Sequence, residues 1–172
     1  MAVADPRLVL RDEELDAGLE LMMLAEAALW AGVDAGLEAD AMTQGLGRSH
    51  WRAAFLMKRR PGLGVQELAR LTSLSKQAAS RVISDLEAKG LAKKAPGDLD
   101  ARRRVARLTE AGQAFEGRIA ERLRGLLARA YRNGGLDGVA GARAILTALA
   151  QGRAQGLGQG LARPTGSAAD GR

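Results

Sequence analysis

The chain has 172 residues, with 47% hydrophobic residues and 26 Lys and Arg against 20 Asp and Glu, which is the profile of a folded globular protein. It holds no cysteine and one histidine, so disulfides, thiolate metal sites, cysteine nucleophiles, thiol-based sensing and histidine-rich metal sites are excluded. The N-terminus lacks the apolar core of a signal peptide, and no apolar run approaches the ~20 residues that span a bilayer. We therefore expect a soluble, cytoplasmic protein with no membrane partner.

Charge is distributed unevenly along the chain. Residues 1–42 hold 10 Asp and Glu against 2 Arg, whereas residues 58–107 hold 13 Lys and Arg against 5 Asp and Glu. An acidic segment is thus followed by a basic one. Because a basic segment is often only a solvated surface, charge alone supports nucleic-acid binding and a plain charged surface about equally.

Two helices are predicted ahead of the basic segment. Between Leu15 and Leu37 the apolar residues recur mostly at three- or four-residue steps, which predicts an amphipathic helix over residues 12–41 with an acidic outer face. Three glycines within it are expected to weaken its far end. A second helix is expected over residues 47–59, because the sequence Arg-Pro-Gly that follows stops a helix.

A helix-turn-helix pattern lies inside the basic segment. A short helix is expected over residues 65–71, and a three-residue turn connects it to a longer helix over residues 75–89. Ser75 suits the N-cap of this longer helix, and Gly90 suits a left-handed cap at its C-terminal end. A four-residue repeat predicts its buried stripe, formed by Leu74, Ala78, Val82 and Leu86.

Short β-type runs and further helices follow the helix-turn-helix pattern. Residues 91–95 and 105–108 flank a loop that contains Pro96 and Gly97, which predicts a two-stranded hairpin. A long helix should then run from Thr109 to the glycines near residue 134. A last helix is expected to bury Val139, Ala142, Ile145, Leu146 and Leu149, before a Gly-rich polar tail predicted to be disordered.

The predicted fold class is mostly α with a small β-hairpin wing. Residues 1–45 would hold an N-terminal dimerisation helix, and residues 46–112 a winged helix-turn-helix lobe. Residues 113–150 would hold C-terminal dimerisation helices, and residues 151–172 the tail. Dimerisation is expected because the flanking helices carry more apolar surface than a lone winged helix of this size can cover.

The predicted helix over residues 75–89 has a polar and basic outer face in its first turns, where a recognition helix meets base edges in the major groove. Lys and Arg suit guanine, Gln suits adenine, and Ser serves bases or phosphates. The candidate DNA-binding residues on this helix are Ser75, Lys76, Gln77, Ser80, Arg81 and Ser84. A solvated helix face is the alternative, which the preceding short helix and turn disfavour.

Three consecutive arginines, Arg102, Arg103 and Arg104, fall in the predicted hairpin loop. An arginine at a loop tip can enter the minor groove, where the negative potential is strongest over narrow A·T tracts, while its neighbours contact phosphates. Acidic residues in such a loop repel phosphate, and they are expected to pair with an arginine and hold its side chain.

Enzymatic activity is not expected, because the sequence offers no paired carboxylates on one face and no phosphate loop at a strand–helix junction. No cofactor and no metal are expected. Two alternatives to a sequence-specific DNA-binding protein remain: a winged-helix module for protein contacts, and a nucleic-acid-binding protein without sequence preference. The basic recognition face disfavours the first, and the lack of aromatics between residues 58 and 107 disfavours the second.

The segment from Leu68 to Gly112 resembles the MarR family of bacterial transcriptional regulators. The resemblance rests on Leu68-Ala69, Leu74-Ser75, Leu86-Glu87-Ala88-Lys89-Gly90-Leu91, Asp100-Ala101-Arg102 and Leu108-Thr109-Glu110-Ala111-Gly112. It implies a homodimer with one winged helix-turn-helix per subunit, bound to a pseudo-palindromic operator in double-stranded DNA, and we expect a repressor. It also implies that Arg102 is the minor-groove arginine and Asp100 its support. Because Ala101 stands where the family often has arginine, the choice among Arg102, Arg103 and Arg104 stays open.

Many proteins of this family bind a small ligand between the dimerisation helices and the DNA lobe. The resemblance therefore makes Trp30, His50, Trp51 and Arg52 a candidate ligand pocket for a small-molecule effector that releases the DNA. The favoured alternative is that the tryptophans belong to the core and that His50 is an ordinary surface or capping residue.

Overall fold

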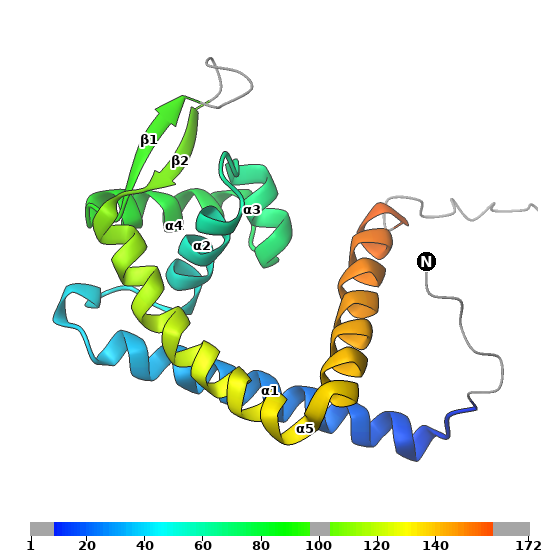
Figure 1. Ribbon diagram of the computed structural model, residues 1–172. Coiled ribbons are helices and arrows are strands. Elements are labelled where there is room, and N and C mark those ends of the chain that lie inside the picture. Colours follow the sequence, from blue (N-terminus) through cyan, green and yellow to red (C-terminus); the bar gives the residue numbers. More distant parts are fainter. Residues whose placement is uncertain (1–8, 97–103, 160–172) are drawn as a thin grey trace, which may run out of the picture. The chain divides into compact units, whose positions relative to one another are not determined.

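The computed structural model describes residues 9–96 and 104–159 of the chain. It is mostly helical and contains one two-stranded antiparallel sheet, which confirms the predicted fold class (Figure 1). Its elements are α1 (Asp12–Glu38), the 3-10 turn η1 (Ala41–Thr43), α2 (Arg48–Arg59), α3 (Val65–Thr72), α4 (Lys76–Ala88), β1 (Ala92–Pro96), β2 (Arg104–Leu108) and α5 (Glu110–Gln159). The chain divides into two compact units, Met1–Gly125 and Leu126–Arg172.

The core of the first unit lies among α2, α3, α4, the hairpin and the first turns of α5. Its most deeply buried apolar side chains are Phe115, Leu68, Leu86, Ile119 and Val33. Val33 is the one residue of α1 that is fully buried, and the other apolar residues of the predicted amphipathic stripe are half-buried or exposed in the single chain.

The glycines of α1 permit close packing against α5. A Cβ at Gly32 would lie 2.7 Å from a methyl carbon of Leu123, and a Cβ at Gly36 would lie 2.9 Å from Ile119. The sequence prediction treated these glycines only as weak points of the helix, and the partner helix that requires them was not visible in the local pattern.

The helix-turn-helix forms with the predicted caps. Ser75 accepts the backbone N–H of Ala78 at 3.1 Å, which satisfies a free donor in the first turn of α4. At the other end Gly90 has φ of 69°, and Leu91 N–H donates to the carbonyl of Leu86 at 2.8 Å, a Schellman cap. Ser73, in the turn between α3 and α4, holds the left-handed conformation with φ of 60°.

The buried stripe of α4 differs from the predicted four-residue repeat. The buried residues are Ala79, Val82, Ile83 and Leu86, whereas Leu74 and Ala78 are only half-buried. Because an α-helix has 3.6 residues per turn, a strict four-residue repeat rotates away from one face, and the buried face follows steps of three and four instead.

The hairpin pairs Ala92 with Leu108, Lys93 with Arg107, and Pro96 with Arg104. Its base is closed onto α5 by Thr109, whose hydroxyl donates to the carbonyl of Gly90 at 2.7 Å and accepts the N–H of Gly112 at 3.1 Å. The predicted wing residues Asp100, Arg102 and Arg103 lie outside the described residues.

The second unit begins within α5, and its helical course is interrupted once. Gly135 has φ of 66° and ψ of −176°, so the predicted break at the glycines is present. The helix then continues to Gln159, beyond the expected end near Gln151. The prediction that the last helix buries its apolar residues does not hold within one chain, since Ile145, Leu146 and Leu149 are exposed.

Candidate nucleic-acid interface

The outward face of α4 collects the predicted DNA-contacting side chains. Lys76, Gln77, Ser80, Arg81 and Ser84 are all exposed, because the opposite face of the helix is buried in the core. Ser75 is exposed as well, although its hydroxyl oxygen is engaged as the N-cap. The face therefore presents cations, an amide and hydroxyls, which are the groups that bond to base edges and phosphates.

Both carboxylates of α4 bond to neighbouring elements. The Oδ2 atom of Asp85 lies 3.2 Å from Nε2 of His50 on α2, and Oε2 of Glu87 lies 3.7 Å from Nζ of Lys94 on β1. The second carboxylate oxygen of Glu87 is buried and has no hydrogen-bond partner among the described residues. With both acids turned to neighbouring elements, the outward face of α4 carries no negative side chain.

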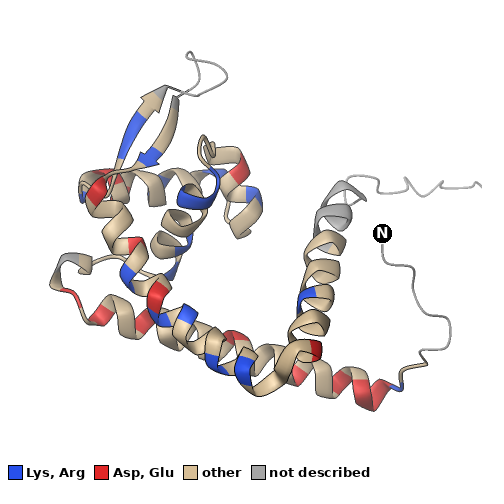
Figure 2. Ribbon diagram, in the orientation of Figure 1, with Lys and Arg blue, Asp and Glu red and all other residues tan. Residues whose placement is uncertain are grey.

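The cations of this lobe fall into two groups. Several are paired with acids, as in Lys58–Glu116, Arg60–Glu67 and Lys94–Glu87. Within residues 9–96 and 104–159, no hydrogen bond or ion pair is formed by the side chains of Lys76, Arg81, Lys89 or Lys93, which lie on α4, at its C-cap and on β1. Figure 2 shows basic residues on both strands of the hairpin, while α1 carries acidic residues.

Sequence reasoning missed Lys89 and Lys93 as members of this surface. Lys93 could have been found from the alternation of the hairpin, because side chains of adjacent strand residues point to opposite faces. Lys94 turns to Glu87, and Lys93 therefore points away from that contact and is exposed. Of the three predicted wing arginines, Arg104 opens β2 opposite Pro96.

A cavity of about 200 Å³ lies between α1, the first turns of α2 and the turn that precedes α4. Its lining residues are Trp30, Arg48, Ser49, Arg52, Thr72 and Leu74. Two guanidinium groups approach the ring of Trp30, with the Cζ atoms of Arg48 and Arg52 at 5.6 and 5.9 Å from its centroid. The cavity thus offers an aromatic wall and positive charge.

An ion pair fixes one side of this cavity. Arg48 donates from Nε and Nη2 to both carboxylate oxygens of Asp34, with Nη2 and Oδ2 2.5 Å apart. The hydrogen bond from Arg48 lowers the pKa of Asp34 below its ordinary value, and the same contact raises the pKa of Arg48. On the other side Arg52 donates to the carbonyl of Thr72 at 3.4 Å.

The structure places two of the four predicted pocket residues at the cavity and the other two elsewhere. Trp30 and Arg52 line the cavity, whereas His50 and Trp51 do not. Trp51 is buried in the core, where its indole N–H donates to the carbonyl of Glu116 at 3.4 Å. His50 accepts the N–H of Gly47 on Nδ1 at 2.9 Å and so caps the first turn of α2. This position agrees with the alternative interpretation, in which His50 is a capping residue and not part of a ligand pocket.

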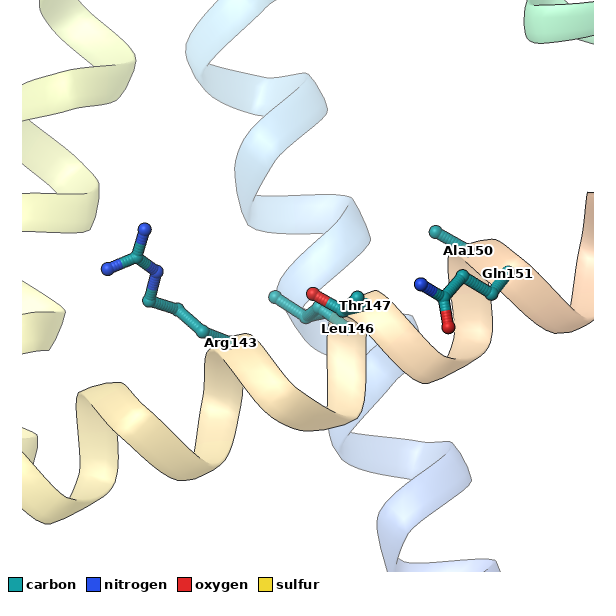
Figure 3. A pocket seen from close by; sticks show the side chains of 5 residues that line it. All are labelled: Arg143, Leu146, Thr147, Ala150 and Gln151. Atoms are coloured by element: carbon teal, nitrogen blue, oxygen red, sulfur yellow. The ribbon is translucent and has the colours of Figure 1, made fainter. Parts of the chain in front are cut away.

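Within residues 9–96 and 104–159, no group of three or more His, Asp or Glu side chains could hold a metal ion. In the same ranges no helix is long and apolar enough to cross a membrane. A hollow on α5, lined by Arg143, Leu146, Thr147, Ala150 and Gln151, belongs to one helix and is a surface groove (Figure 3).

A helix-turn-helix followed by a hairpin, with a polar and basic recognition helix, defines a winged helix-turn-helix DNA-binding protein. A sequence model of the MarR family matches residues 44–103. The chain is 36% identical over 142 residues to the HTH-type transcriptional regulator PetP of Rhodobacter capsulatus, and the match covers 83% of each chain. The protein belongs to the MarR family of transcriptional regulators, which bind DNA and are not enzymes.

Solved structures share this fold. A MarR/EmrR family transcriptional regulator from Acinetobacter sp. ADP1 superposes with a TM-score of 0.66 at 20% identity, covering 83% of this chain and 97% of that one. CouR from Rhodococcus jostii RHA1, solved bound to p-coumaroyl-CoA, superposes with a TM-score of 0.57 at 19% identity, covering 86% and 92%.

Proposed function

We propose that the protein is a homodimeric, sequence-specific repressor that binds a pseudo-palindromic operator and is released by a small ligand. The observation that carries the proposal is the outward face of α4. It presents Lys76, Gln77, Ser80, Arg81 and Ser84 without a competing acid, as a helix in the major groove requires.

The wing completes the DNA contacts in this proposal. One of Arg102, Arg103 and Arg104 enters the minor groove, and Asp100 holds its side chain. The others bind phosphates together with Lys89 and Lys93, whose ammonium groups form no ion pair within the described residues. The hairpin directly follows α4, which supports simultaneous contact with adjacent grooves.

Exposed apolar side chains support a homodimer. Leu15, Leu19 and Leu24 on α1, and Ile145, Leu146 and Leu149 on α5, are exposed in the single chain. Exposed apolar surface of this extent marks a protein interface. A twofold axis would place two recognition helices roughly 34 Å apart, on successive major grooves of one DNA face.

The cavity beside Trp30 is the proposed effector site. Its indole ring and the guanidinium groups of Arg48 and Arg52 suit a small aromatic anion. Because Thr72 and Leu74 flank the turn that leads into α4, an occupant would contact the segment that positions the recognition helix. CouR, which is similar in fold, was solved with p-coumaroyl-CoA.

A gel-shift titration tests the proposal. The probe is the DNA directly upstream of the protein's own gene, at about 150 mM salt, where unspecific attraction to phosphate is weakened. A discrete shifted band that survives excess scrambled competitor supports operator recognition. Loss of every band to the competitor, both with this fragment and after selection from a random library, would favour DNA binding without sequence preference.

A further inference from the structure

We propose that His50 is a positioning residue that keeps Asp85 away from the DNA-facing side of α4 and so leaves Arg81 available to DNA. This inference rests on the proposed role of α4 as the recognition helix. His50 itself lies on α2 and is not on the outward face of α4.

Both nitrogens of the His50 ring are engaged. Nδ1 accepts the N–H of Gly47 at 2.9 Å, and Nε2 lies 3.2 Å from Oδ2 of Asp85. An accepting Nδ1 carries no proton, so the neutral ring holds its proton on Nε2 and donates it to the carboxylate. The side chain is 12% exposed, which keeps water from competing well for these bonds.

Asp85 lies beside the residues that are proposed to contact DNA. It follows Ser84 directly and stands four residues after Arg81, and its side chain is 45% exposed. Residues four apart on a helix are neighbours, and opposite charges at that spacing form an ion pair. A carboxylate released from His50 could therefore turn to Arg81.

The side chain of Arg81 forms no ion pair or hydrogen bond with any residue in the described ranges. An ion pair with Asp85 would engage its guanidinium and place a negative charge beside incoming phosphates. Both effects weaken DNA binding. His50 prevents them with one hydrogen bond, and the same bond connects the first turn of α2 to the recognition helix.

Two substitutions of His50 separate this role from helix capping. Glu and Gln at this position can both accept the N–H of Gly47, since they are the preferred residues at the third position of a helix. Only Gln can also donate to Asp85. His50→Gln therefore preserves the tether, whereas His50→Glu places a second carboxylate against Asp85 and drives it toward Arg81.

The experiment compares the operator affinity of the unaltered chain with that of His50→Gln, His50→Glu and the double variant His50→Glu with Asp85→Asn. Loss of the charge-assisted hydrogen bond that Arg81 is proposed to make with DNA predicts a dissociation constant about tenfold higher for His50→Glu. His50→Gln should bind like the unaltered protein. The double variant should recover most of the affinity, because the amide introduced at position 85 can donate to the carboxylate introduced at position 50 and cannot form an ion pair with Arg81.

Equal affinity of the Glu and Gln variants would overturn the proposal, as would a failure of the double variant to recover. If His50→Glu does not fold, the ring itself gives the answer, because the chain has one histidine and so one set of imidazole NMR signals. The proposal requires the proton on Nε2 in the neutral ring, and a proton on Nδ1 would contradict it. Absence of operator binding by the unaltered chain would instead contradict the proposed function.

Discussion

The ammonium group of Lys58 on α2 lies 2.5 Å from the carboxylate of Glu116 on α5, whose side chain is 1% exposed. The carbonyl of the same Glu116 accepts the indole N–H of Trp51, which also belongs to α2. One residue of α5 is therefore bonded through both its side chain and its backbone to α2. These two bonds attach the helix-turn-helix lobe to the first turns of the helix that leads out of it.

Lys58→Met should destabilise the protein by about 2–4 kcal/mol. The substitution leaves a buried carboxylate without its partner, and the half-exposed position of Lys58 reduces the cost below that of a fully buried pair. Denaturant unfolding followed by circular dichroism measures the change. Lys58→Arg keeps the charge and is the control, and an equal loss in both variants would mean that packing, and not charge, dominates here.

Gly112→Ala should cost about 3 kcal/mol or more, because an added Cβ would lie 1.9 Å from the carbonyl oxygen of Leu91. Gly117→Ala in the same helix is the matched control, since its Cβ would meet only the end of Lys58 at 3.9 Å. That control should be neutral or slightly stabilising. Similar melting temperatures for the two variants would show that the backbone of Leu91 can shift without cost.

The close contact at Gly112 also shows how far the sequence could predict the fold. The Leu-Thr-x-x-Gly motif pointed to the family, but the reason for its glycine is a contact with Leu91, which lies on the other side of the hairpin in sequence. Caps such as Ser75 and Gly90 were predictable because they depend on adjacent residues. The ion pair at Glu116 joins residues 58 positions apart, and no local pattern reveals it.

In the candidate site, too, the sequence reveals what depends on local pattern and misses what depends on contacts between residues far apart in the chain. The outward residues of α4 follow from helical periodicity, so the sequence located them. The roles of His50 and Trp51 depend on partners in α4 and α5, and the resemblance placed both in a pocket that they do not line. Lys93 was missed although strand alternation predicts that its side chain is exposed, and the structure adds that this side chain forms no ion pair within the described residues.

Arg81→Ala and Lys93→Ala should weaken DNA binding in different ways. Loss of a base-reading Arg81 should cost about 1–3 kcal/mol on the operator and relax specificity at one position. Loss of Lys93 should weaken binding to all sequences alike and lower the salt slope by about 1. Fluorescence anisotropy at several salt concentrations measures both, with exposed Arg122 on α5 changed to Ala as the control. A uniform loss for Arg81→Ala would assign it to phosphate.

The Asp34–Arg48 ion pair should make the free energy of unfolding depend on pH in the acidic range. The folded-state pKa of Asp34 lies below the ordinary value of 3.8, so the stabilisation is fully present above that pH and is lost as pH falls through the folded pKa. Asp34→Asn removes this dependence. The difference in unfolding free energy between the two proteins should be constant near neutral pH and shrink below about pH 4. A difference that stays constant in acid would show that the ion pair does not stabilise the fold.

Ile145→Glu should separate the proposed dimer and abolish operator binding together. Ile145 is 63% exposed in the single chain and shares one helix face with Leu149. A charge on an apolar face that is buried against a second copy is left without solvation, which disfavours association. Ala144→Glu, on another side of the same helix, adds the same charge and should leave the dimer intact. Sedimentation should give twice the 18.1 kDa of one chain for the unaltered protein and for Ala144→Glu, and 18.1 kDa for Ile145→Glu. A dimeric Ile145→Glu that still binds the operator would move the interface away from this face of α5, and α1 would then have to supply it.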